Sequence, residues 1–325
     1  MKVLRLLVIA ITVSSAASAC DLCSVYASLQ AKGSAKGWFG GAFEQYTHFG
    51  TLQLDGDEVP NPLDQHLDSS ITQLFAGYQF SDAFGVQANL PYVHRAFRRA
   101  APAGQSLGPL PEGESVENGT ETGLGDSELL AHWRPVFAIR VDTVFALTVL
   151  GGVKLPTGSS DRIAEELEEG SEEDGVPSGI HGHDLALGSG SVDGIVGLSA
   201  FLDHKRLVAN ASVQYSLRTT GDFDYRYAND LSWSFAPGYY FSLEHENTLS
   251  VALVLSGEQK GQDTLAGNKT DDTAISAVYL GPQLSYSRGS NLYAEAAADF
   301  PLRQNNAALQ AVPDYRVRLA VTWRP

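Results

Sequence analysis

The two cysteines of the chain, Cys20 and Cys23, are spaced C-x-x-C close to its N-terminus. This spacing fits a structural disulfide in an oxidising compartment, a redox or metal site, or lipid attachment to Cys20. Ser24, not a histidine, follows Cys23, so covalent attachment of a c-type haem is not indicated. We predict a disulfide or redox role for the pair and leave lipid attachment open.

A second group that could do chemistry is His181, His183 and Asp184 in the run H-G-H-D. Two imidazoles and a carboxylate suit a transition metal, although an ordinary polar loop would have the same composition. Just upstream, residues 161–174 hold eight carboxylates and one arginine, a local charge of 1 − 8 = −7. This stretch is either a solvated surface loop or a site for a hard cation such as calcium.

Signatures of enzymes and of nucleic-acid binding are missing from the sequence. It contains neither a G-x-S-x-G nor an H-E-x-x-H motif. Its formal charge is 22 − 38 = −16, which repels phosphate backbones. We therefore expect no enzyme activity, no cofactor and no nucleic-acid partner. The many glycines and aromatics, with only 18% charged residues, are typical of a β-rich protein.

The elements that must position the remaining polar side chains are strands. From Tyr315 to Trp323 the odd positions are apolar or aromatic, whereas the even positions include Arg316 and Arg318. This period of two describes a strand with one apolar and one polar face. About twelve such segments follow one another along the chain, and the apolar face of the last one begins and ends with an aromatic, as in a lipid-facing strand.

The predicted connections alternate between short turns and long polar loops. Turns are expected at 81–82, near Pro135, and at 203–206, 244–247 and 288–290, and long loops at 50–66, 99–121, 156–185, 219–226, 258–271 and 304–312. Strands that span a bilayer must pair all their backbone groups, so the sheet must close. The sequence thus predicts an all-β, antiparallel transmembrane β-barrel of about 12 strands, with long extracellular loops and short periplasmic turns. A periplasmic β-sandwich is the alternative.

The N-terminal segment predicts the compartment and the domain limits. Residues 1–19 combine Lys2 and Arg5, a short apolar core and the small-residue run 17–19, as a cleaved secretory signal does. The apolar core is shorter than the roughly 20 residues that a membrane helix needs. We expect a signal peptide over 1–19, a periplasmic segment with the C-x-x-C over 20–36, and an outer-membrane barrel over 37–325.

Three blocks resemble the family of the MetA-pathway of phenol degradation, whose members are outer-membrane barrels. They are 77–93 with its Leu-Pro-Tyr, Gly123-Leu-Gly-Asp126 followed by His132-Trp-Arg134, and Lys154-Leu-Pro-Thr-Gly158 followed by 187–193. The family is distantly similar to the fatty-acid-channel barrels. The resemblance implies passage of small, often hydrophobic compounds across the outer membrane, and it names no particular solute.

If the apolar positions face lipid, the charged positions of opposite parity face the lumen. The lumen set is predicted to be Asp126, Glu128, His132, Arg134, Lys154, Asp193, Arg218, Glu295, Asp299, Arg316 and Arg318. Acids and bases on neighbouring strands, such as Asp299 beside Arg316, would form ion pairs. Such pairs either fill and rigidify a narrow barrel or form a constriction that selects solutes by charge.

The preferred function from sequence is a channel for a small, hydrophobic or aromatic solute in a Gram-negative-type outer membrane, with membrane lipid and the solute as partners. The alternative is a closed barrel that docks a periplasmic redox or metal-handling partner through the C-x-x-C segment.

Overall fold

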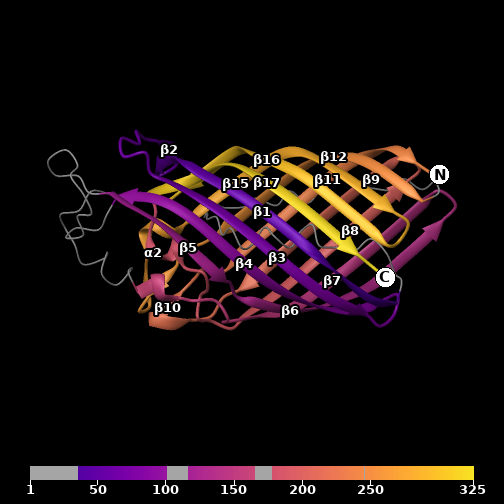
Figure 1. The fold of residues 1–325 in the computed structure, drawn as a ribbon, viewed down its shortest axis with the longest axis horizontal. Coiled ribbons are helices and arrows are strands. Elements are labelled where there is room, and N and C mark those ends of the chain that lie inside the picture. The colour runs from indigo at the N-terminus through magenta and orange to yellow at the C-terminus, as the bar shows by residue number, and fades with distance from the viewer. Residues whose placement is uncertain (1–35, 101–115, 165–177, 245) are drawn as a thin grey trace, which may run out of the picture.

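The computed structural model describes residues 36–100, 116–164, 178–244 and 246–325. Twelve long antiparallel strands form one continuous sheet (Figure 1). They are β1 (Gly37–Leu54), β3 (His66–Gln79), β4 (Phe84–Ala100), β6 (Ser127–Arg140), β7 (Thr143–Leu155), β8 (Asp193–His204), β9 (Leu207–Leu217), β11 (Asp230–Leu243), β12 (Asn247–Lys260), β15 (Ile275–Arg288), β16 (Leu292–Asn306) and β17 (Leu309–Trp323). The sheet closes because β1 pairs with β3 on one side and with β17 on the other. The predicted signal peptide, Cys20, Cys23 and the part of the acidic stretch from residue 165 onward lie outside the described residues.

Two further strands extend the barrel wall at one end: β2 (Asp57–Glu58), which pairs with β1, and β5 (Val116–Leu124). Residues 92–100 of β4 pair with β5, and residues 84–89 of β4 pair with β6. Strands β5 and β6 therefore follow one another along the same edge of β4. The chain leaves the ladder between them at Gly125 and Asp126. In the described part of the chain no helix is long and apolar enough to cross a membrane.

The outward face of the strands is an apolar belt. On β17, Val317, Leu319 and Trp323 are 39%, 50% and 57% exposed, whereas Arg316 and Arg318, at positions of the opposite parity, are buried. The same alternation runs along β4. Exposed apolar side chains at every second position of a closed sheet are what contact with lipid requires. The barrel is therefore a transmembrane β-barrel, as the sequence predicts.

The connections follow the predicted alternation with two corrections. β16 ends at Asn306 and β17 begins at Leu309, so the long loop expected at 304–312 is a tight hairpin. No turn occurs near Pro135 either, since β6 runs through it with a bulge between Trp133 and Val136 and ends at Arg140. The longer connections gather at one end, which is extracellular in bacterial barrels and is called the outer end below.

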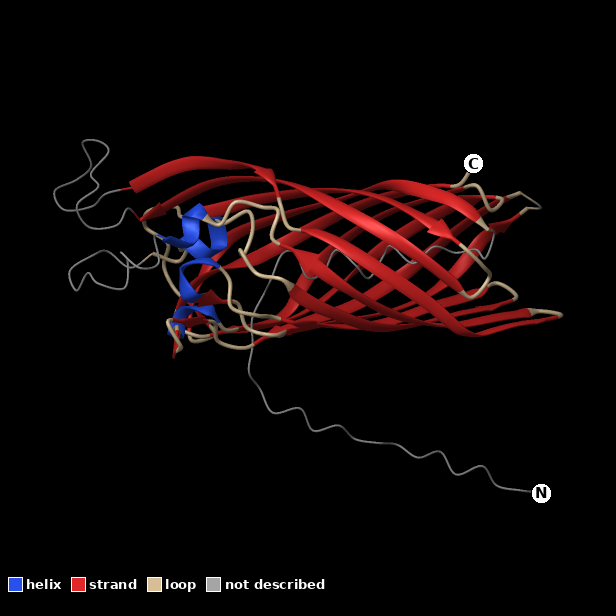
Figure 2. Cartoon of the chain, turned by 90° about the horizontal axis from the view of Figure 1, so that it is seen from below, coloured by secondary structure: helices blue, strands red, loops and turns tan. Residues whose placement is uncertain are grey.

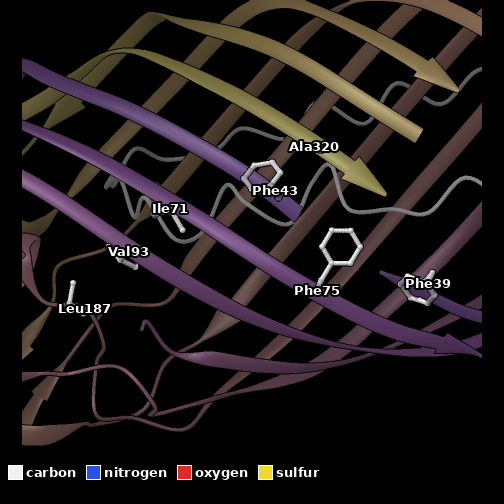
Figure 3. Packing of buried hydrophobic residues seen from close by; sticks show 7 residues of the cluster. All are labelled: Phe39, Phe43, Ile71, Phe75, Val93, Leu187 and Ala320. Atoms are coloured by element: carbon white, nitrogen blue, oxygen red, sulfur yellow. The ribbon is translucent and has the colours of Figure 1, made fainter. Parts of the chain in front are cut away.

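The inward face is less polar than the sequence predicts. Phe39 and Phe43 of β1, Ile71 and Phe75 of β3 and Val93 of β4 form one buried cluster on the inside of neighbouring strands (Figure 3). Polar inward side chains of β7, β8, β15 and β17 lie elsewhere around the wall. The lumen wall thus carries an apolar cluster on β1, β3 and β4, next to the polar side chains of β17.

The outer end is filled by the connection between β7 and β8 together with a small second sheet. The described parts of this connection contain η2 (Asp161–Ile163) and α2 (Gly182–Leu185), and Figure 2 shows the helices at that end of the barrel. Ile180 and Leu185 pack on Phe49, Leu67 and Phe97 of the wall. The small sheet of β10 (Tyr225–Arg226), β13 (Thr264–Leu265) and β14 (Asn268–Lys269) packs beside η2. This packing fixes the residues described next.

Candidate functional site

Asp126 joins three segments at the outer end of the lumen. Its Oδ1 accepts a hydrogen bond from the Gly158 amide at 3.0 Å, and its Oδ2 accepts one from the Ser189 amide at 3.0 Å. Lys154 Nζ lies 2.5 Å from Oδ2. Asp126 lies in the second and these partners lie in the third of the blocks that carry the family resemblance. A Cβ on Gly188 would lie 2.6 Å from Asp126 Oδ1, so this close approach requires glycine there.

A chain of alternating charges extends from Asp126 along the outer ends of five strands. Lys154 Nζ lies 3.0 Å from Asp193 Oδ2, and the same oxygen lies 3.1 Å from Arg218 Nη1. Arg218 Nη2 in turn contacts Asp230 Oδ2 at 2.8 Å. All five side chains are almost fully buried, so each charge depends on its neighbours for compensation. Four of them belong to the predicted lumen set, and Asp230 was missed.

A second ionic cluster lies on β17 and the strands near it. Arg318 binds Asp299 of β16 with Nε and Nη2, at 2.7 and 3.0 Å. Arg316 reaches past β16 and β15 to Glu258 of β12, with Nη2 2.6 Å from Oε1, and its guanidinium lies over the ring of Tyr279. These groups line a small cavity of about 30 Å³. Glu258 and Tyr279 were not predicted.

Glu295, also expected beside these arginines, lies on β16, the strand next to β17. Its Oε2 accepts hydrogen bonds from Gln283 and Tyr293, at 3.0 and 2.6 Å. Glu295 therefore lies on the inward face with a polar set of its own.

The other predicted lumen residues lie on β6, Glu128 at the outer start of the strand and His132 and Arg134 further toward the inner end. Glu128 accepts a hydrogen bond from Asn89 at 3.1 Å, and His132 pairs with Gln79 at 3.1 Å. Arg134 lies over the ring of Phe137. Beyond the end of β17, burial lowers the pKa of the Arg324 guanidinium, and the positive charge of Arg134 lowers it further. The inner end of the lumen is thus locally basic.

A cavity of about 90 Å³ lies at the outer end, between the wall and the β7–β8 connection. Its charged lining includes Asp126, Lys154 and Arg218 of the charge chain, and its apolar lining comes from three strands of the wall and the β7–β8 connection. The side chains that line the cavity include Phe49, Leu67, Arg95, Asp126, Lys154, Ile180, His183, Asp184, Arg218, Lys260 and Ala311. Arg95, Lys260 and Ala311 were not singled out from the sequence.

His181, His183 and Asp184 come together at α2, beside this cavity. One potential ligand atom from each lies within 4.8 Å of the others, and the two imidazole rings are stacked at 5.6 Å. Asp272, from η4 (Asp271–Thr273), adds a carboxylate 3.5 Å from His181 Nε2. Nitrogen and carboxylate donors at such separations are the set that zinc prefers.

Zinc binding is therefore a testable expectation for this cluster. We expect isothermal titration calorimetry of the purified barrel to detect Zn²⁺ binding that is lost in His183→Ala. His204→Ala is the matched control, because His204 pairs with Thr143 at the turn end of β8. Equal zinc binding by the two variants would contradict the expectation.

Comparison with known proteins shows what the chain resembles. A model of the family of the MetA-pathway of phenol degradation matches residues 178–308. No curated protein matches the sequence significantly. The crystal structure of the COG4313 outer membrane channel from Pseudomonas putida F1 superposes with a TM-score of 0.58 at 13% identity, over 89% of this chain and 95% of that chain.

Two autotransporter barrels are more distant. The beta domain of Bordetella BrkA gives a TM-score of 0.45 at 10% identity, over 88% of this chain and 99% of that one. The translocator domain of NalP from Neisseria meningitidis gives 0.44 at 12% identity, over 94% of each chain. The superposition on the Pseudomonas putida barrel shows the fold of an outer-membrane β-barrel, and residues 178–308 carry the sequence pattern of the family of the MetA-pathway of phenol degradation.

Proposed function

We propose that this barrel passes a small hydrophobic or aromatic solute across the outer membrane. One observation carries the proposal: at the outer end of a closed, lipid-facing cylinder, a cavity of about 90 Å³ combines an apolar lining that includes Phe49, Leu67 and Ile180 with charged side chains. The apolar part of this lining provides contact area for an apolar solute, while the few polar groups can orient it. The similar Pseudomonas putida barrel is an outer membrane channel, which supports the same role here.

The experiment is reconstitution of the purified, folded protein in planar lipid bilayers. We expect discrete conductance steps, because each inserted barrel would open one path for ions and small solutes. Liposomes that contain the protein and are loaded with a small phenolic solute should also exchange the solute faster than loaded liposomes without the protein do. A protein that shows the heat-dependent gel shift of a folded barrel, but gives neither conductance steps nor faster solute exchange, would contradict a channel.

Asp142→Ala provides the control for the Asp126 variants and for the Arg316 and Arg318 variants below. Asp142 lies in the exposed two-residue turn between β6 and β7, far from the lumen clusters in the strand register. We expect its conductance and stability to equal those of the unaltered chain. The docking role through Cys20 and Cys23 is not proposed, since no described residue bears on it.

A further inference from the structure

The cavity at the outer end has two chemically different sides. Phe49 of β1, Leu67 of β3, Ile180 of the β7–β8 connection and Ala311 of β17 form its apolar side. On the other side four basic side chains reach the cavity from four different elements. They are Arg95, Lys154, Arg218 and Lys260. A ligand that fills this cavity must satisfy both sides.

Three of these four cations are compensated by carboxylates. Lys154 and Arg218 share Asp193, and each has a second carboxylate in Asp126 or Asp230. Lys260 Nζ lies 2.7 Å from Asp263. These carboxylates therefore neutralise the positive charges of Lys154, Arg218 and Lys260, and the three side chains add little net attraction for an anion.

Arg95 differs from them. It is 5% exposed, and its one hydrogen bond to the described chain runs from Nη1 to the Ala186 carbonyl at 2.5 Å. Its Nε is buried and has no hydrogen-bond partner among the residues described. Nε together with Nη2 forms the fork that binds a carboxylate through two parallel hydrogen bonds. A buried guanidinium donor without an acceptor is costly, so this fork favours an anionic ligand.

The carboxylates nearest to Arg95 along the sheet are taken by other arginines. Glu121 lies opposite Arg95 in the β4–β5 register, but its Oε1 is 2.6 Å from Arg162 Nη2. Glu117 pairs with Arg99 at 2.7 Å. Within the described residues, three guanidinium groups thus share two carboxylates, and the surplus positive charge lies at Arg95.

We infer that the outer cavity binds an amphipathic organic anion, with its carboxylate on the Nε–Nη2 fork of Arg95 and its apolar body against Phe49, Leu67, Ile180 and Ala311. The inference deepens the proposed function, on which it rests, by giving the solute a negatively charged group. A neutral aromatic compound would leave the Arg95 fork without an acceptor. An inorganic anion would leave the apolar side of the cavity empty.

The test is calorimetric titration of benzoate into the purified barrel in detergent, with benzamide as the uncharged analogue. We expect benzoate to bind and benzamide to bind at least 10-fold more weakly. Arg95→Gln should lower benzoate affinity by about 10- to 100-fold, as loss of a charged hydrogen-bond pair does. Arg98→Gln is the matched control, because Arg98 has the opposite parity on β4 and bonds to the Leu63 carbonyl and Asn118.

Equal affinities of the unaltered chain for benzoate and benzamide would overturn the inference even if Arg95→Gln failed to fold. Equal benzoate affinities of folded Arg95→Gln and Arg98→Gln would overturn it as well. Arg95→Lys, which keeps the charge and loses the fork, should have intermediate affinity. Bilayer conductance separates the two proposals: benzoate binding without conductance refutes the channel and leaves the site, and conductance without binding does the reverse.

Discussion

Replacing Asp126 with alanine is expected to lower the free energy of unfolding by about 3–5 kcal/mol, the usual cost of removing one partner from a buried ion pair. The substitution leaves Lys154 with Asp193 as its remaining carboxylate in the described structure, and that carboxylate is shared with Arg218. It also leaves the buried amide of Ser189 and the amide of Gly158 without their acceptor. Each such loss costs free energy because water does not replace the lost partner.

Denaturant unfolding of the purified barrel in detergent, followed by tryptophan fluorescence, measures this effect. Asp142→Ala should unfold at the same denaturant concentration as the unaltered chain. Asp126→Asn separates charge from shape, since its carbonyl oxygen can still accept from Gly158 while its amide faces Lys154. We expect it to be destabilised less than Asp126→Ala. An unchanged midpoint for Asp126→Ala would show that the three segments are held together by other contacts.

The strand pattern could be predicted from sequence because lipid imposes it. Every second residue within the belt must be apolar, so the alternation from Tyr315 to Trp323 or from Phe84 to Tyr92 gives both the strand and its lipid-facing parity. Closure of the sheet follows from the same condition. The fold class and the number of long strands are therefore confirmed.

The strand ends could not be predicted in the same way. β4 continues to Ala100 and β12 continues to Lys260. In both strands these ends lie beyond the last exposed apolar residue of the alternating pattern, because there the strand still pairs with its neighbours but no longer faces lipid. Arg95 and Glu258 lie on these extensions with inward parity, so extending the alternation by a few residues would have found them. The polar run Gln304–Asn306 resembles a loop for the same reason, although it forms a paired strand end.

Partner choice inside the barrel is a second feature that sequence does not supply. The order of strands in the sequence placed Glu295 and Asp299 beside the two arginines of β17, and Asp299 does bind Arg318. Arg316 instead reaches Glu258, three strands away in the sheet. A closed wall curves back on itself, so long inward side chains meet across it. Only the curvature and tilt of the finished barrel decide which of them meet.

Replacing Arg316 and Arg318 together with alanine is expected to shift the channel toward cations. The double substitution leaves Glu258 and Asp299 on the lumen wall without their guanidinium partners, so the local charge changes by −2. Uncompensated carboxylates attract cations and repel anions at a narrow point of a pore. The reversal potential of reconstituted channels in a salt gradient should therefore move toward the value for cation passage.

Two further variants make the measurement specific to charge. Arg318→Ala combined with Asp299→Ala removes one pair completely and leaves the wall neutral, so its reversal potential should stay close to that of the unaltered chain. Asp142→Ala, at the exposed turn, should not change it either. If the Arg316→Ala, Arg318→Ala channel kept its reversal potential, the pairs would stabilise the wall without setting the charge preference of the path. If the neutral variant shifted as far as the charged one, a change in shape, not in charge, would explain both results.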